Sequence, residues 1–324
     1  MPEPYTLTRY RGAWAISYRN EDGKRLRITT GTDDRRLAEA RAREIWSRRS
    51  AALSERIDDL WPAYVADRIA DGVRADRFKC HWTALKDHFG HRLGMSVTRE
   101  DCRAYHRERR GDGYSDSTIK TDLEFLRACL RRRYGADSPN IWIPPASPPR
   151  EDWLSKAQAR KLVDAAETPH VRLFVILGLA TGARAGAILD LTWDRVDFDQ
   201  GTINLRPSGR IQTNKRRTVV PMNENAREAL LEAHSGRLSD HVVEFGGKPI
   251  TSVKTAIKGL SIRSGVPFTP NVLRHTCAVW MAQADVPMQK ISQYLGHTST
   301  RVTEGTYARY SPSFMRDAGA ALAF

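Results

Sequence analysis

The sequence lacks the features that mark membrane, secreted and metal-dependent proteins. No run approaches the ~20 apolar residues of a membrane span, and the opening stretch MPEPYTLTRYRG has no apolar signal-peptide core, so we expect a cytoplasmic protein with no membrane partner. The four cysteines are scattered without paired spacing, which speaks against a disulfide framework or a zinc site and predicts buried thiols. The chain also has no P-loop and no carboxylate cluster for a two-metal nuclease site, so we expect no cofactor.

Basic residues, by contrast, are abundant. The 324 residues include 52 Lys and Arg against 38 Asp and Glu, a formal net charge of +14. This balance favours a polyanionic partner, above all nucleic acid, although basic soluble enzymes carry similar charge. A chain of this length predicts two or three domains.

The first 50 residues predict a small three-stranded sheet followed by a helix. In GAWAISYR and KRLRITTG, apolar residues alternate with polar or small ones on either side of a turn at 21–23. Arg25 and Arg27 share one face of the last strand and are candidate DNA contacts. Helix-start residues then predict a helix over 32–49. A structural or oligomerisation role for this module remains open beside DNA binding.

Residues 51–137 predict a basic helical domain. Its four amphipathic segments are IDDLWPAYVADRIA, ADRFKCHWTALKDHFG, TREDCRAYHRERR and SDSTIKTDLEFLRACLRRRYG. The end of the fourth segment carries three further candidate DNA contacts, Arg131, Arg132 and Arg133. The segment 138–152 is rich in proline, cannot form a regular helix and is predicted to be an extended linker.

The stretch 269–310 predicts three helices that bring an arginine, a histidine and a tyrosine together. Asn271 and Arg274 are three residues apart and share a face of the first helix. His297 follows a Leu-Gly pair that ends the second helix, and Tyr307 lies on the third. The predicted core-facing residues of the first helix are Leu273, Cys277, Trp280, Met281 and Ala284.

A second arginine follows a helix end upstream. The helix PHVRLFVILGLA runs into Thr-Gly-Ala-Arg184, and the next segment, AGAILDLTW, is predicted to continue as helix. VDFDQGTINLR then predicts a hairpin, and RRTVVPM a third strand. Taken alone, the sequence Thr-Gly-x-Arg would mark an ordinary helix end. Together with the hairpin and the basic stretch that follow, it forms a pattern specific enough to compare with known families.

These segments resemble the catalytic boxes of the tyrosine recombinases, the phage integrase family. The run TPNVLRHT…QYLGHTST…TYARYSP is similar to the family's C-terminal box, and Thr-Gly-x-Arg with its three-stranded sheet is similar to the upstream box. The catalytic residues implied by the resemblance are Arg184, Lys215, Asn271, Arg274, His297 and Tyr307. Lys215 is taken from its position in the sheet turn, with Arg216 and Arg217 as adjacent alternatives and candidate DNA contacts. The spacing from His297 favours Tyr307 over Tyr310 as nucleophile.

The chain departs from the family pattern at two positions. The family usually has His where this chain has Asn271, and Glu where it has Ala187. An amide can hydrogen-bond a phosphate oxygen but cannot carry a proton or a charge. His275 belongs to the family's usual Arg-His pair, and we expect it to face elsewhere on the helix rather than replace the missing His.

The resemblance implies a multidomain, mainly α fold with small β-sheets. Its parts are a possible arm-type DNA-binding module (1–50), a helical core-binding, SAM-like domain (51–137), the linker (138–152) and an α+β catalytic domain with a C-terminal tail (153–324). The implied protein is a site-specific recombinase that cleaves and rejoins DNA through a 3′-phosphotyrosyl intermediate, integrating or excising a prophage or other mobile element. Implied partners are double-stranded attachment-site DNA, further copies of the chain in a homotetramer, and an excisionase or host DNA-bending factor.

Two other functions stay open. A topoisomerase IB-like relaxer uses the same cleavage chemistry, and an integrase-derived DNA-binding protein could have its catalysis impaired by Asn271. Retention of both arginines, Lys215, His297 and Tyr307 favours activity. An SDS-resistant adduct on nicked attachment-site DNA distinguishes these functions.

Overall fold

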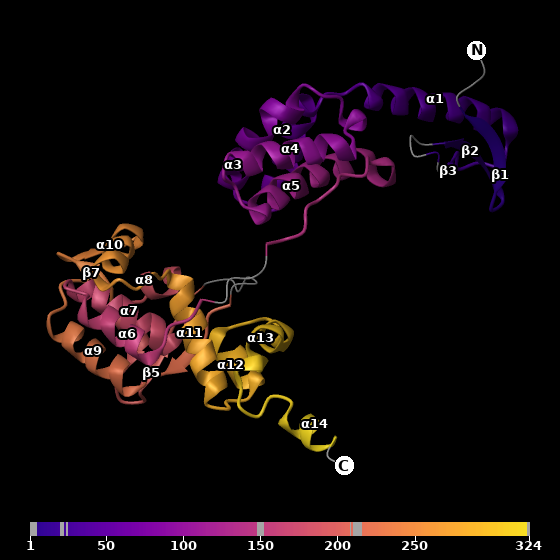
Figure 1. Cartoon of the computed structure of the whole chain (residues 1–324). Helices are drawn as coiled ribbons and strands as arrows, with labels where there is room; N and C mark the ends of the chain where they lie inside the picture. Colours follow the sequence, from indigo (N-terminus) through magenta and orange to yellow (C-terminus); the bar gives the residue numbers. More distant parts are fainter. Residues whose placement is uncertain are drawn as a thin grey trace. The chain divides into compact units, whose positions relative to one another are not determined.

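The chain divides into two compact units, Met1–Pro149 and Arg150–Phe324 (Figure 1). The structure, a computed structural model, describes residues 5–19, 23, 25–147, 152–207, 209 and 216–322, without the side chains of 48–53 and 317. None of the helices in these described ranges combines the length and apolar character of a membrane span. The boundary between the units falls within the proline-rich segment 138–152.

The first unit begins with the expected three-stranded sheet. Strands β1 (Thr6–Tyr10), β2 (Ala13–Arg19) and β3 (Arg25–Thr29) are antiparallel in the order β1-β2-β3. Leu7, Ile16 and Ile28 are register partners across the sheet, and they pack with the apolar side of helix α1 (Arg35–Leu53). The prediction of a sheet followed by a helix is confirmed.

The rest of the first unit is the expected helical cluster. It comprises α2 (Ile57–Ala70), α3 (Ala75–Leu85), a π-helical turn (Lys86–Gly90), a 3₁₀ turn (Gly94–Ser96), α4 (Arg99–Gly111), α5 (Asp116–Tyr134) and a 3₁₀ turn (Gly135–Asp137). The apolar stripe of α5 is fully buried at Leu123, Leu126 and Leu130. Helical periodicity therefore located the core of this unit correctly.

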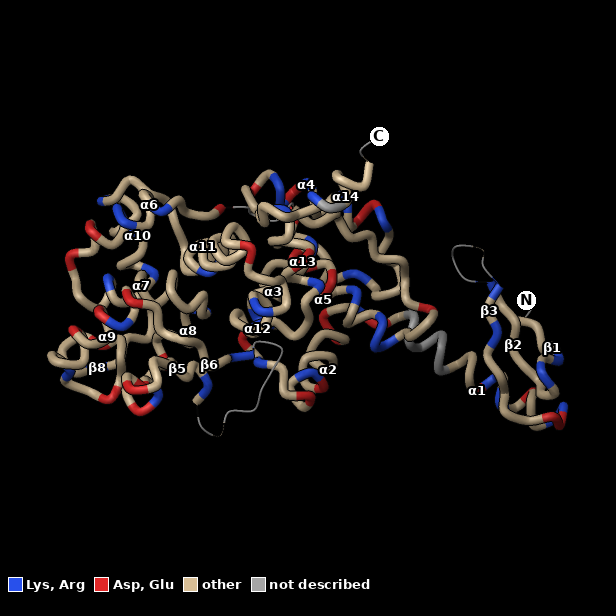
Figure 2. Tube along the Cα trace, turned by 90° about the horizontal axis from the view of Figure 1, so that it is seen from below, with Lys and Arg blue, Asp and Glu red and all other residues tan. Residues whose placement is uncertain are grey.

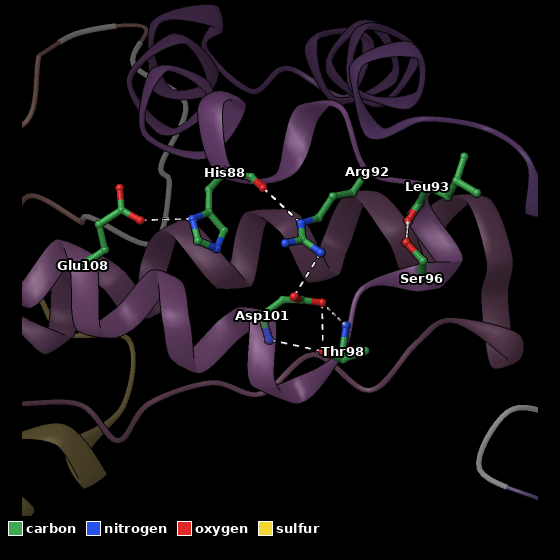
Figure 3. A network of polar contacts seen from close by, with 7 residues as sticks. All are labelled: His88, Arg92, Leu93, Ser96, Thr98, Asp101 and Glu108. Atoms are coloured by element: carbon green, nitrogen blue, oxygen red, sulfur yellow. Dashed lines mark hydrogen bonds and ion pairs between the residues drawn. The ribbon is translucent and has the colours of Figure 1, made fainter.

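A polar network connects the start of α4 to the segment after α3 (Figure 3). Thr98 and Asp101 form a capping box, in which the Asp101 carboxylate accepts from the Thr98 backbone N–H at 2.8 Å. Arg92 adds an ion pair to the same carboxylate at 3.0 Å and donates to the His88 carbonyl. His88 in turn lies 3.1 Å from Glu108 on α4. The network thus links the connection between α3 and α4 to α4 itself.

The second unit combines helices with two small antiparallel sheets. Its elements are α6 (Lys156–Asp164), α7 (Pro169–Thr181), α8 (Ala185–Leu189), a 3₁₀ turn (Trp193–Arg195), β4 (Val196–Asp197), β5 (Thr202–Asn204), β6 (Val219–Pro221), α9 (Glu224–Ser235), β7 (Glu244–Phe245), β8 (Lys248–Pro249), α10 (Lys254–Ser264), α11 (Pro270–Gln283), α12 (Met288–Leu295), α13 (Thr300–Tyr307), a 3₁₀ turn (Ala308–Tyr310) and α14 (Arg316–Ala320). The predicted hairpin and third strand form the sheet β4-β5-β6.

Helix α7 forms the centre of this unit and packs against both α9 and α11. The contact with α11 is close, since a Cβ placed on Gly178 would lie only 2.7 Å from Leu273 Cδ1. Helices α12 and α13 follow α11 and lie beside it (Figure 1). This packing brings the ends of α7, α12 and α13 to one region of α11.

Three local predictions were wrong. Helix α8 ends at Leu189, because the backbone of residues 191–193 is instead hydrogen-bonded to the segment 240–242. Cys80 is exposed, since it lies on the outer side of α3, whereas the other three cysteines are buried. Ala284 is exposed because α11 ends one residue earlier, so it caps the helix and does not face the core.

Candidate active site

The Thr-Gly-Ala-Arg turn is shaped by close packing at the end of α7. The Thr181 hydroxyl donates to the Leu177 carbonyl at 2.6 Å and accepts from the Ala183 N–H at 3.2 Å. Gly182 ends the helix with φ of 59°, in the left-handed region that favours glycine. A Cβ at this position would also lie 2.6 Å from Leu295 Cδ2 on α12. Glycine is therefore required at position 182 both for the left-handed backbone and for the close approach of Leu295.

Arg274 on α11 is buried and anchored, with 9% of its surface exposed. Its Nη1 donates to the Gly182 carbonyl and its Nη2 to the Leu295 carbonyl, both at 2.8 Å. These carbonyls lie at helix C-termini, where they lack partners within the helix. Burial, and then the charge of Arg184, lower the pKa of Arg274 to about 10, so the side chain remains cationic at neutral pH. Arg274 is therefore a fixed positive charge that has further N–H groups with which to bind a ligand.

Arg184 adds a second guanidinium beside Arg274. It is half-buried, its Nη1 donates to the Arg216 carbonyl at 3.3 Å, and burial lowers its pKa. A cavity of about 230 Å³ is lined by four arginines, Arg184, Arg216, Arg217 and Arg274. A small cavity with this many cationic side chains is suited to an anion such as a phosphate.

The residues between β5 and β6 differ in their contacts. Lys215 lies outside the described residues. Arg217 forms an ion pair with Asp190 and donates to the Gly186 carbonyl at 3.2 Å, and its side chain is only 12% exposed. Arg216 is exposed and lines the cavity. Arg217 therefore braces the sheet against α8, which makes it a weaker candidate for leaving-group protonation than its neighbours.

His297 is held by the turn after α12. Gly296 takes φ of 68°, and a Cβ there would lie 2.8 Å from the Arg216 carbonyl oxygen. The Nδ1 of His297 lies 2.8 Å from the hydroxyl of Thr303, a fully buried residue of α13. Burial, and then the charges of Arg274 and Arg184, lower the pKa of His297 to about 4. The imidazole is thus neutral at neutral pH, and a Thr303 hydroxyl donating to Nδ1 leaves its proton on Nε2.

Tyr307 is the last residue of α13 and is 4% exposed. Burial raises the pKa of its phenol to about 12 in spite of the Arg274 charge, which lowers it. The hydroxyl lies 2.8 Å from Nδ1 of His275, and the two rings are tilted with centroids 5.5 Å apart. Tyr310 instead packs edge-on against Trp153.

His275 faces elsewhere on α11 than Arg274, as expected, yet it contacts a residue of the site. Successive residues of a helix point about 100° apart, so His275 does diverge from Arg274. Helix α13 nevertheless packs along α11 and places Tyr307 over the side to which His275 points. Sequence reasoning also missed Thr303, although its position four residues before Tyr307 on one helix was a usable signal.

Asn271 is exposed in the first turn of α11. Its side chain makes no hydrogen bond within the described part of the chain. The structure therefore brings Arg184, Arg274, His297 and Tyr307 together around one region, whereas Asn271 lies at its exposed margin, one helical turn before Arg274.

The arginines proposed as DNA contacts in the first unit differ in whether their side chains already bind other groups of the protein. Arg25 donates to the Ser17 hydroxyl at 2.7 Å, and the Arg27 guanidinium lies 4.8 Å from the centroid of the Tyr10 ring. Arg131 is exposed at the end of α5. Lys and Arg positions are spread over both units and do not gather on one element (Figure 2).

The two arginines after Arg131 brace α5 against the start of the helical cluster. Arg132 forms an ion pair with Asp67 on α2. Arg133 binds both carboxylate oxygens of Glu55, at 2.6 and 3.0 Å. A DNA phosphate would have to compete with these carboxylates for either side chain.

A model of the phage integrase family matches residues 152–313. The chain is 28% identical to an integrase of Streptomyces ambofaciens over an alignment of 189 residues, which covers 48% of this chain and 48% of that relative. It spans about half the length of the first curated relatives that it matches. Among solved structures, it is similar to the Tn1549 transposon integrase in complex with transposon right end DNA, with a TM-score of 0.70 and 19% identity over 83% of this chain and 100% of that one. It is also similar to a lambda integrase tetramer bound to a Holliday junction, with a TM-score of 0.64 and 17% identity over 93% and 97% of the two chains.

Proposed function

The chain belongs to the phage integrase family, and from the geometry of its site we propose that it is a tyrosine-type site-specific DNA recombinase. Tyr307 attacks a DNA phosphodiester, forms a 3′-phosphotyrosyl bond and releases a 5′-hydroxyl. A 5′-hydroxyl from another strand then attacks that bond and restores the phosphodiester. The observation that carries this proposal is the buried Arg274, which is anchored beside Arg184 at a small cavity and whose charge acts on Tyr307.

Charge stabilisation is the main task of such a site. Attack on a phosphodiester passes through a five-coordinate phosphorus with added negative charge on its non-bridging oxygens. Arg184 and Arg274 each offer a planar fork for two oxygens, and they need no reorganisation because the fold already holds them. His297, with its proton on Nε2, adds a neutral donor. We assign protonation of the departing 5′ oxygen to Lys215.

We further propose the partners that follow from this chemistry. The substrate is a double-stranded attachment site of a prophage or other mobile element, met in the cytoplasm. A homotetramer holds two duplexes, by analogy with the lambda integrase tetramer on a Holliday junction. The proposal includes an excisionase or a host DNA-bending factor as accessory partner. We propose DNA contacts for Arg25, Arg27, Arg131 and Arg216, which form no ion pair with a carboxylate among the residues that the structure describes.

Covalent capture tests the proposed function and identifies the DNA site in the same experiment. The protein is incubated with fragmented host DNA and with a randomised duplex library that carries nicks, denatured in SDS, and the protein-linked DNA is sequenced. We expect one enriched sequence, a 3′ end blocked by protein and a free 5′-hydroxyl. Binding without any adduct would indicate an impaired integrase-derived DNA-binding protein, and adducts without sequence preference would indicate a topoisomerase IB-like relaxer.

The exposed Asn271 predicts that the site tolerates a more reactive residue. Asn271→His should raise the rate of adduct formation on the captured duplex, because imidazole can carry a proton or a charge where the amide cannot. The gain is bounded by the roughly 10²–10⁴-fold that a positioned acid-base group contributes. Asn271→Ala is the control for loss of the amide alone. A slower Asn271→His protein would show that the surrounding residues are adapted to Asn.

The C-terminal tail carries uncovered apolar side chains. Phe314, Met315 and Leu322 are 48%, 65% and 79% exposed. The chain before them is held at Asp285, which accepts hydrogen bonds from the Ser311 and Ser313 hydroxyls. An exposed apolar segment whose preceding residues are hydrogen-bonded to the protein suits docking on a neighbouring protomer of the proposed tetramer.

Deletion of 313–324 should therefore leave single-site cleavage largely intact and impair assembly on DNA. Assembly is measured by light scattering or gel mobility on duplexes with two sites, and cleavage by adduct formation on one site. A Phe314→Ser, Met315→Ser, Leu322→Ser variant keeps the chain length, and Leu238→Ser is a matched surface control, since Leu238 is 73% exposed. Unchanged assembly of both tail variants would contradict the docking role.

A further inference from the structure

The nucleophile proposed above has one close polar neighbour. The Tyr307 hydroxyl lies 2.8 Å from His275 Nδ1, and the two rings are in contact with centroids 5.5 Å apart. Both residues belong to regular helices, α13 and α11, which pack against each other. The contact is thus built into the packing of two helices and does not depend on a loop.

The chemistry of phenol attack requires a proton acceptor at this position. Burial raises the pKa of Tyr307 to about 12, so very little phenolate exists at neutral pH. A phenol that attacks phosphorus must lose its proton as the new bond forms, and a neighbouring base provides the usual route. In the part of the chain that the structure describes, His275 Nδ1 lies within hydrogen-bond distance of that hydroxyl, and it accepts the phenolic proton in the tautomer that carries its own proton on Nε2.

The other charged and titratable groups near His275 are poorly suited to this task. Arg274, its neighbour on α11, is a cation, and His297 has its Nδ1 against Thr303. Asp152, on the segment before α6, acts on His275 only through its charge. Tyr310 is a second phenol near Tyr307 and packs on Trp153.

We propose that His275 is the general base of the cleavage step, and this inference rests on the recombinase function proposed above. As Tyr307 Oη forms its bond to phosphorus, the phenolic proton moves to His275 Nδ1, and the imidazole becomes imidazolium. The bond between phosphorus and the 5′ oxygen breaks, and that oxygen takes a proton from Lys215. In rejoining, the entering 5′-hydroxyl returns a proton to Lys215, and the imidazolium returns its proton to the departing Tyr307 oxygen.

The resting state of His275 fits this role. Burial, and then the charge of Arg274, lower the pKa of His275 below its ordinary value of 6.5, while Asp152 opposes them. The imidazole is therefore neutral at neutral pH and can accept a proton. His275 loses the ability to act as a base as the pH falls through its pKa, so the rate of adduct formation should fall on the acid side.

The exposed position of Asn271 makes His275 more important in this chain. Where the family usually has His, an amide that cannot take a proton stands at the margin of the site. His275, four residues further along α11 and on nearly the same face of the helix, supplies an imidazole to the same reaction. The chain therefore has a titratable side chain beside Tyr307 even though Asn271 replaces the family's usual His.

The test uses His275→Asn, which can still hydrogen-bond Tyr307 but cannot carry its proton. Single-turnover adduct formation on the captured duplex should fall by roughly 10²–10⁴-fold at neutral pH. The pH profile should change shape as well. The wild-type rate should be level between about pH 7 and 9, whereas the His275→Asn rate should rise by about tenfold per pH unit, because its phenol must ionise into water before it attacks.

A substrate with sulfur in place of the 5′-bridging oxygen separates the base from the acid. A thiolate leaves without a proton, so Lys215→Ala should regain most of its rate on this duplex, whereas the defect of His275→Asn should remain. His275→Ala serves as a second variant, whose rate should be raised by added imidazole. His170→Asn is the matched control, since His170 is also partly buried but lies at the far end of α7, ~18 Å along the helix from Gly182.

Three outcomes overturn the proposal: a His275→Asn rate within about threefold of wild type, a defect relieved by the sulfur substrate, or a faster reaction. The last would identify the contact as a restraint on Tyr307. Failure of the proposed function looks different, because the wild-type protein would then form no adduct with any duplex. Thermal unfolding and binding of the captured duplex show that each variant is folded and has bound its DNA.

Discussion

Replacement of Tyr307 by phenylalanine should abolish the covalent DNA adduct while fold and DNA binding persist. The substitution removes one oxygen from a side chain that is 4% exposed and packs in an apolar cluster with Ala278 and Leu295. The ring and its contacts remain. The loss of the hydrogen bond to His275 should cost about 1 kcal/mol of unfolding free energy. Adduct formation has no other nucleophile at this position, so the expected loss is complete within detection.

Tyr310→Phe is the matched control for this substitution. Its ring packs edge-on against Trp153, and its hydroxyl accepts from Arg309 at 3.4 Å. The adduct should therefore form at close to the wild-type rate. Both variants are compared by SDS gel on the captured duplex, with binding measured by gel shift and stability by thermal unfolding. A Tyr307→Phe protein that still traps DNA would show that the nucleophile lies elsewhere.

Replacement of Arg274 should give the next largest effect, and it should affect both rate and stability. Arg274→Lys keeps the charge, but an ammonium cannot donate to the Gly182 and Leu295 carbonyls and also present a planar fork to the phosphate. The loss of one fixed donor to a developing oxyanion slows such reactions by roughly 10²–10³-fold. We expect at least this decrease in single-turnover adduct formation.

The stability effect distinguishes Arg274 from Arg184. Arg274→Ala leaves two buried carbonyls without partners, and each unsatisfied group costs about 1–3 kcal/mol. Arg184 is only half-buried and donates to the single Arg216 carbonyl at 3.3 Å. Arg184→Ala should therefore lose a comparable amount of activity with a much smaller decrease in thermal stability. Equal melting temperatures for the two alanine variants would mean that Arg274 does not hold the helix ends together.

Local sequence patterns predicted the elements of this protein well. The apolar stripe of α5 and the strand alternation around Arg25 each depend on side chains close together in the same segment. Such patterns are recognisable whichever surface the segment packs against. The Thr-Gly-x-Arg turn is of the same kind, since Gly182 is needed for a local left-handed backbone.

Local patterns did not show which distant segments pair with one another. Helix α8 is short because the loop at 240–242 pairs with the backbone after it. Arg217 is tied to Asp190, and Arg133 to Glu55, by partners 27 and 78 residues away. Neither the free energy of these pairs nor their geometry can be read from the residues beside them.

The sequence by itself determined which chemical groups this protein has, on which helices they lie, and the family to which it is similar. Only the tertiary structure decided how these groups meet. Arg274 is fixed because the ends of α7 and α12 converge on it, and His275 faces Tyr307 because α13 packs along α11. The physical reason is that the periodicity of a helix gives the direction of each side chain, whereas its partner depends on which other helix covers that direction.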